Sequence, residues 1–203
     1  RVMKKLRTDL QIIYDWIPNG VRVLDLGCGD GNLLTSLQRR DVTGYGLEID
    51  NSQIANCIES KVNVIQADLD LGLPQFSNQS FDFVILSQTL QAVKRPDFLL
   101  DEIIRVGKQA IIGFPNFGHW QCRKQLVFGG KMPVSKTLPD YWFNNSNIHL
   151  CTIKDFEKLA ADKHVTIIKR SILNHSHKDS LGIKLAPNLL GEIALYQIKK
   201  SAV

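Results

Sequence analysis

Short apolar runs alternate with amphipathic segments along the first half of the chain. Runs rich in β-branched and other apolar residues predict strands at 21–26, 42–50, 62–68, 81–87 and 109–115. Apolar residues at helical spacing predict helices at 9–17, 31–40, 51–60 and 96–106. The run at 81–87 is almost wholly apolar, which is typical of a strand covered on both faces. The alternation predicts an α/β fold with a doubly wound, mostly parallel sheet.

The alternation ends at residue 115. Residues 115–151 show neither a helical nor a strand period, and a segment of this length without elements is usually functional in a compact domain. We therefore expect an irregular insertion there that forms a substrate or partner surface. The whole chain, 1–203, is expected to form a single domain whose N-terminal helix lies within residues 1–20.

The last fifty residues return to regular patterns. Thr152 and Asp155 have the spacing of a capping box and open a predicted helix. After this helix we expect a strand at 164–173, a loop at 174–188 and a final antiparallel strand at 190–200. The loop contains two histidines, but their spacing is not that of metal ligands, so we expect a solvated loop and no metal site.

Composition and charge are those of an ordinary globular protein. Of the 203 residues, 44% are hydrophobic and 22% charged, and the net charge of +5 is scattered along the chain, so we expect no nucleic-acid partner. Neither a membrane-spanning run nor a secretory signal is evident. Four widely spaced cysteines without a C-x-x-C pair indicate reduced thiols in the cytoplasm, and neither zinc nor a redox pair.

A glycine-rich loop follows the first predicted strand. It reads D-x-G-x-G-x-G from Asp25 through Gly27 and Gly29 to Gly31, and its glycines allow a ligand to approach the backbone closely. The dinucleotide fingerprint would need a glycine where Asn32 stands, and an acid beside a pyrophosphate would repel it. S-adenosylmethionine (SAM) carries no phosphate and has two cationic groups, which an acid attracts.

Acidic and polar residues also end the next predicted strands. Glu48 is placed to accept both ribose hydroxyls, and Asp68 to accept from the adenine amino group. Ser87 and Gln88 follow the fourth strand and are expected at the same cleft. The alternative for Glu48 and Asp68 is two solvated acids at loop starts. The expected cofactor site also includes the neighbours of these residues, Cys28, Ile49 and Leu69.

Several segments together resemble the class I SAM-dependent methyltransferases, and more narrowly the family of the methionine biosynthesis protein MetW. The most specific are "SQTLQAV", "PNFGHW", "MPVSKTLP" and "NIHLCTIKDFE", beside "VLDLGCGDGNLL" and "GYGLEID". The resemblance runs from about Arg7 to about Lys199. It implies a seven-stranded sheet whose last strand is antiparallel, and binding of SAM or its product S-adenosylhomocysteine (SAH). It also implies a role in methionine synthesis with homoserine O-acetyltransferase as the protein partner.

Binding of SAM does not by itself predict catalysis. Methyl transfer mostly needs the donor and the acceptor to be positioned, and it uses a base only where the acceptor loses a proton. Of the two histidines in the insertion, His119 is the candidate base, with a histidine hydrogen-bonded in a packed loop as the alternative, and that structural role is the one expected for His149. Aromatic residues of the insertion would line an acceptor pocket or form a docking face. Two hypotheses remain: a regulatory subunit that binds SAM or SAH, and an active methyltransferase with an unidentified acceptor. The sequence indicates no oligomeric state.

Overall fold

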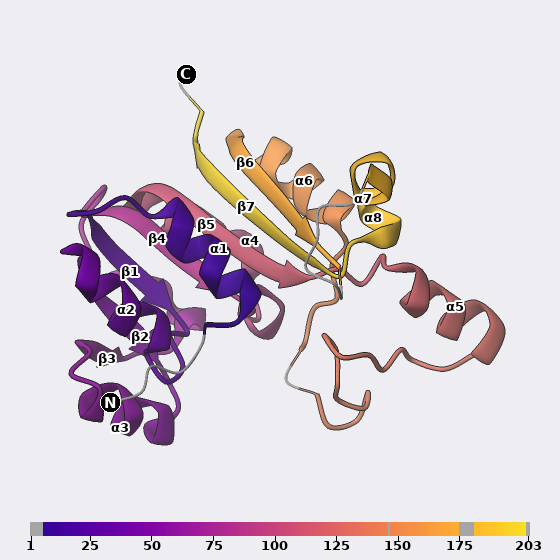
Figure 1. The fold of residues 1–203 in the computed structure, drawn as a ribbon, viewed down its shortest axis with the longest axis horizontal. Coiled ribbons are helices and arrows are strands. Elements are labelled where there is room, and N and C mark those ends of the chain that lie inside the picture. Colours follow the sequence, from indigo (N-terminus) through magenta and orange to yellow (C-terminus); the bar gives the residue numbers. More distant parts are fainter. Residues whose placement is uncertain (1–5, 146, 175–180, 202–203) are drawn as a thin grey trace.

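A mixed seven-stranded sheet forms the centre of the molecule (Figure 1). The structure is a computed structural model and describes residues 6–145, 147–174 and 181–201. The strand order is β3-β2-β1-β4-β5-β7-β6. The strands are β1 (Arg22–Leu26), β2 (Thr43–Glu48), β3 (Val64–Gln66), β4 (Phe81–Ser87), β5 (Gly107–Pro115), β6 (Val165–Leu173) and β7 (Ile193–Lys200). Strand β7 pairs antiparallel with both β5 and β6, while β1 to β5 are parallel, so the predicted fold class is confirmed.

Helices cover both faces of the sheet. On one face, Ile13 of α1 (Thr8–Trp16), Leu37 of α2 (Asn32–Leu37) and Cys57 of α3 (Asn51–Glu59) share an apolar cluster with residues of β1, β4 and β5. On the other face, α4 (Pro96–Val106) and α6 (Ile153–Asp162) pack on the same central strands. The capping box predicted for α6 is present, with Thr152 and Asp155 bonded to each other's backbone N–H. Three short 3-10 helices, η1 (Gln38–Arg40), η2 (Leu69–Leu71) and η3 (Leu90–Ala92), complete these layers.

Two segments predicted to be irregular contain helices. Helix α5 (Trp120–Gly129) lies within the insertion expected at 115–151. Its apolar residues are not gathered on one face, so the sequence shows no helical period there. Helices α7 (Leu181–Leu185) and α8 (Pro187–Leu190) replace the second half of the loop expected at 174–188. They are too short for a periodic signal, and residues 175–180 of that loop lie outside the described residues.

The connections reverse direction between β1 and β4. From β1 the chain proceeds through β2 to β3 on one side, and from β4 through β5 on the other. The carboxyl ends of β1 and β4 are therefore neighbours with no crossover helix between them, which is the place where open α/β sheets bind ligands. The glycine-rich loop leaves β1 at this point.

Candidate functional site

A cavity of about 250 Å³ opens at the carboxyl ends of β1 and β4. One wall is the glycine-rich loop with Asp25, and the opposite wall is the segment Ser87–Thr89 after β4. Helix α1 supplies a third wall through Arg7 and Leu10. The structure thus brings together six of the residues expected at this site: Asp25, Gly27, Cys28, Gly29, Ser87 and Gln88.

The glycines of the loop have left-handed backbone conformations. Their φ angles are +70° at Gly27, +55° at Gly29 and +73° at Gly31, a region that other residues enter only at a cost. A Cβ on Gly27 would lie 2.6 Å from Oγ1 of Thr89, so a larger residue there would collide with the opposite wall. A Cβ on Gly29 would meet nothing within 4 Å. Gly29 therefore keeps backbone bare at the cavity, where a ligand needs the space.

Most backbone N–H groups of the loop are already bonded within the protein. The N–H groups of Gly27 and Cys28 both donate to the carbonyl of Leu47, and that of Gly31 donates to the carbonyl of Cys28. The N–H of Asn32 donates to the Asp30 side chain. A pyrophosphate would need several of these donors. The loop suits a ligand held by shape and by acceptor groups better than it suits a phosphate.

Asp25 is a buried acid at the cavity. Its fractional exposure is 4%, and no described residue donates a hydrogen bond to its carboxylate. Burial first, and then the nearby charge of Glu48, raise its pKa from 3.8 to about 7. A buried carboxylate without donors is costly, and a ligand with N–H donors or a positive charge removes that cost. This environment fits the ammonium and sulfonium groups of SAM.

Glu48 joins the end of β2 to the glycine-rich loop. Its Oε2 accepts a hydrogen bond of 2.9 Å from the N–H of Gly29. Its Oε1 accepts from the N–H groups of Ile49 at 2.8 Å and Asp50 at 3.1 Å. A carboxylate offers about four lone-pair positions, so these three bonds leave about one open. A ribose diol has two hydroxyl donors, so it would use the open position and displace one of the three existing hydrogen bonds.

The other predicted residues lie near the same edge of the sheet, outside the lining of the cavity. Asp68 follows β3 and is the N-cap of η2, where its side chain accepts a hydrogen bond of 2.9 Å from the N–H of Asp70. Leu69 packs against the core, and Ile49 is 61% exposed. Beside the cavity, the hydroxyl of Ser87 lies 3.5 Å from a carboxylate oxygen of Asp9.

Helix α1 contributes to the site, which the sequence analysis did not foresee. The guanidinium of Arg7 pairs with the buried carboxylate of Asp9 through two bonds of 2.9 and 3.0 Å. Arg7 is the N-cap of α1, and Leu10 lies in the first turn of the helix. The sequence carries no signal that brings the start of this helix to the cavity. Residues Asp30, Asn32, Leu33 and Thr89 also line the cavity without having been predicted.

Two cysteines that are distant in sequence meet beneath the loop. The Sγ atoms of Cys28 and Cys57 lie 3.8 Å apart as free thiols, and the Cys57 thiol donates to the carbonyl of Gly29 at 3.1 Å. Burial raises the pKa of both thiols, and Asp25 adds to the effect on Cys28. The two cysteines are 29 residues apart in the sequence, and helix α3 brings them together by packing on the loop.

His119 lies apart from the lining of the cavity. It precedes α5, is 5% exposed, and its ring centroid lies 5.7 Å from that of Trp120. Burial lowers its pKa, so the ring is neutral at pH 7, which is the form that a base requires. The nearby Asn116 is buried and structural: its amide donates to the carbonyls of Asn188 and Gly191.

A second cavity of about 390 Å³ adjoins the first. The two cavities share Arg7 and Gln88, and the second is also lined by Lys136 and Thr137 of the insertion. Gln88 has a left-handed φ of +56°, which is strained for a residue other than glycine, and its buried Nε2 has no hydrogen-bond partner among the residues that the structure describes. Strain and an unsatisfied donor at the junction of two cavities are typical of a functional position.

Two other kinds of feature are absent from the described residues. No group of three histidine, cysteine or acidic side chains in this part of the chain is placed to hold a metal ion. None of the described helices has the length and apolar character needed to cross a membrane.

Comparison with known structures identifies the fold. A SAM-dependent methyltransferase from Mesorhizobium loti superimposes with a TM-score of 0.70 over 96% of this chain and 98% of its own, at 16% identity. A SAM-dependent methyltransferase from Archaeoglobus fulgidus gives a TM-score of 0.66 over 94% and 91% of the two chains, at 19% identity. At these identities the similarity is one of fold.

Sequence comparison is more specific. The bifunctional methionine biosynthesis protein MetXA/MetW of Rhodopirellula baltica is 38% identical over 172 residues, which cover 80% of this chain. The chain spans only 28% of the length of that relative. The family model of the methionine biosynthesis protein MetW matches residues 7–198. The chain therefore belongs to the MetW family, and it has the fold of the SAM-dependent methyltransferases.

Proposed function

We propose that this protein binds SAM or SAH in the cavity at Asp25 and acts as a regulatory subunit of homoserine O-acetyltransferase in methionine biosynthesis. The observation that supports the ligand is the buried Asp25 carboxylate, which lines the cavity and receives no hydrogen bond from the described residues. A sulfonium nucleoside with an ammonium group supplies both charge and donors, and it contains no phosphate for Asp25 to repel.

The partner is supported by the family. One relative combines MetXA and MetW in one chain, and we take its larger remaining part to be the acyltransferase. Fusion of two proteins in one organism favours a physical association of the separate chains in another. SAM is formed from methionine, so a subunit that binds SAM can report the output of the pathway to an early enzyme.

A short segment links the cavity to the insertion. Thr89 lines the cavity against Gly27, and two residues later the carbonyl of Gln91 accepts the N–H groups of Ile148 and His149 at 2.8 and 2.9 Å. The Gln91 side chain donates back to the carbonyl of Gln88 at 2.8 Å. A ligand that moves Thr89 therefore acts on the segment that holds the end of the insertion. Regulation follows if SAM binds the free and the associated protein with different affinities.

A second candidate function is methyl transfer. The observation that favours it is the adjoining cavity of about 390 Å³, which shares Arg7 and Gln88 with the first and has room for an acceptor. The protein would then need to orient the acceptor for in-line attack, with Gln88 as a positioning residue at the junction.

One set of measurements separates these functions. Calorimetry with SAM and with SAH tests binding, and a lack of heat with both at high micromolar concentration contradicts the ligand. Co-purification and acylation assays with homoserine O-acetyltransferase, with and without SAM, test the regulatory role. A complex whose rate responds to SAM supports it, and the absence of any complex refutes it. Turnover of SAM to SAH in the same mixture, beyond an enzyme-free control, would indicate the methyltransferase.

A further inference from the structure

The insertion is folded into a distinct arm, defined as the described residues 120–145 and 147–148. Helix α5 runs outward and the following chain returns beside it (Figure 1). The Gln125 amide makes two hydrogen bonds to the backbone of Val134, at 3.0 and 3.1 Å, and fastens the return to the helix. The N–H of Ser135 donates to the carbonyl of Leu138, which is itself 3% exposed. These contacts hold the arm in a defined shape.

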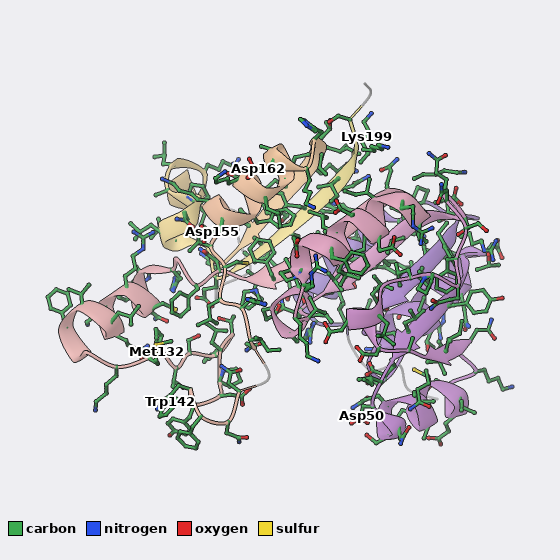
Figure 2. All side chains as sticks on the ribbon, turned by 180° about the vertical axis from the view of Figure 1, so that it is seen from behind. Asp50, Met132, Trp142, Asp155, Asp162 and Lys199 are labelled. Carbon is green, nitrogen blue, oxygen red and sulfur yellow. The ribbon has the colours of Figure 1, made fainter. Side chains whose placement is uncertain are left out.

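The arm exposes an unusual amount of apolar surface. Seventeen large hydrophobic side chains are exposed among the described residues, and ten of these lie in the arm. Phe128 is 83% exposed and Trp142 is 75% exposed. Figure 2 shows Met132 and Trp142 on this arm, away from the sheet. Concentration of apolar side chains in one surface element marks an interaction site, whereas scattered exposure has no such meaning.

Three of the exposed aromatic rings are ordered against one another. The rings of Tyr141 and Phe143 stack with centroids 5.7 Å apart, and Trp142 meets Phe143 edge to face at 5.8 Å. All three are more than 60% exposed. Preformed clusters of Trp, Tyr and Phe are typical of binding hot spots, because little further entropy is lost when a partner covers them.

The charge of the arm and the distribution of its apolar residues indicate the kind of partner. The arm holds four basic residues, Arg123, Lys124, Lys131 and Lys136, and one acid, Asp140. This charge fits an apolar partner face with an acidic rim. It would also fit an anionic membrane, but a helix that lies on a membrane separates an apolar from a polar face. The apolar residues of α5 are not gathered on one side, which favours a protein partner.

We propose that the arm is the surface that docks on homoserine O-acetyltransferase, with Phe128 and the 141–143 aromatic cluster as its anchors. The proposal rests on the proposed function for the identity of the partner, and it adds the location of the interface. Helix α5 has ten residues, and a helix of this length is only marginally stable in water unless it packs against another surface. The partner would cover the outer side of α5, opposite the buried Cys122 that faces the domain.

The test compares three variants in a titration against purified homoserine O-acetyltransferase. Phe128→Asp and Trp142→Asp each replace an apolar anchor by a charge that the complex would have to bury, and each is expected to weaken the complex at least about tenfold. The control is Leu71→Asp on η2, which alters a side chain that is 75% exposed but outside the arm, and it should bind like the wild type. Thermal unfolding and SAM affinity should be unchanged in all three, since the altered side chains are exposed.

The outcomes distinguish a wrong location of the interface from a wrong identity of the partner. A wild-type complex that Phe128→Asp and Trp142→Asp leave intact overturns the arm as the interface, while the proposed function stands. The absence of a wild-type complex overturns the partner itself. Sedimentation of the wild type, but not of Trp142→Asp, with vesicles containing phosphatidylglycerol would assign the arm to a membrane surface and also overturn the proposal.

Discussion

The Glu48 carboxylate accepts a hydrogen bond of 2.9 Å from the N–H of Gly29. The acid that ends β2 thereby holds the loop that follows β1, and it joins two residues that are 19 positions apart in the sequence. Glu48 has a structural role before any ligand arrives. Binding of a ribose, as we propose, would compete with the loop for the lone pairs of this carboxylate.

Substitution of Glu48 by glutamine tests this double role. Glu48→Gln keeps the size of the side chain but removes the charge and one acceptor oxygen. We expect the affinity for SAM or SAH to fall about ten- to hundredfold, as charge-assisted bonds contribute roughly 1.5–3 kcal/mol. Calorimetry measures the change, and Glu59→Gln at the exposed end of α3 is the matched control. Wild-type affinity in Glu48→Gln would show that the ribose binds elsewhere.

The raised pKa of Asp25 predicts a pH-dependent stability. Its pKa is about 7 in the folded protein and near 3.9 in an unfolded chain. The folded state therefore binds the proton more tightly, and Asp25 destabilises the fold increasingly as the pH rises from about 4 to about 7. Asp25→Asn removes this effect. We expect its free energy of unfolding, relative to wild type, to rise by on the order of 3 kcal/mol between pH 5 and pH 8.

Urea unfolding of both proteins at the two pH values measures this difference in the absence of ligand. A constant difference between them at pH 5 and pH 8 would mean that Asp25 titrates normally and is solvated in the folded protein.

The glycines offer a matched pair of substitutions. Gly29 and Gly20 both have left-handed φ angles, +55° and +69°, and a Cβ on either meets nothing within 4 Å. Alanine at each position should cost a similar 1–2 kcal/mol of stability. Only Gly29 lines the cavity, so Gly29→Ala alone should weaken ligand binding. Equal ligand affinity in the two variants would place the ligand away from the loop.

The thiols should react slowly in the folded protein. Burial raises the pKa of all four cysteines, and that of Cys151 reaches about 12. Because the thiolate is the reactive form, alkylation by iodoacetamide at pH 8 should be much slower than that of a free thiol such as glutathione. Unfolding in guanidinium chloride should restore rapid reaction at four sites. Mass spectrometry follows both rates, and a fast site in the native protein would contradict the burial of that thiol.

The sheet was predictable because its signals are local. A strand covered on both faces needs a continuous apolar run, as at Phe81–Ser87, and a helix start is marked by its own residues, as at Thr152. The glycine-rich loop was equally predictable from the sequence, since a left-handed backbone conformation favours glycine at fixed positions. Helix α5 escaped prediction because it buries only Cys122, and a helix without an apolar face leaves no period.

The features of the candidate site also fall into those that the sequence predicts and those that depend on the tertiary structure. Sequence alone determined the fold class, the loop and the acids at the strand ends, because each follows from residues that are neighbours along the chain. Tertiary structure decided the rest: that Glu48 bonds the loop at Gly29, that Cys57 lies under Cys28, that Arg7 lines the cavity and that His119 does not. These relations arise when strands and helices distant in sequence pack together, and side-chain distances between such elements are fixed only by the packing.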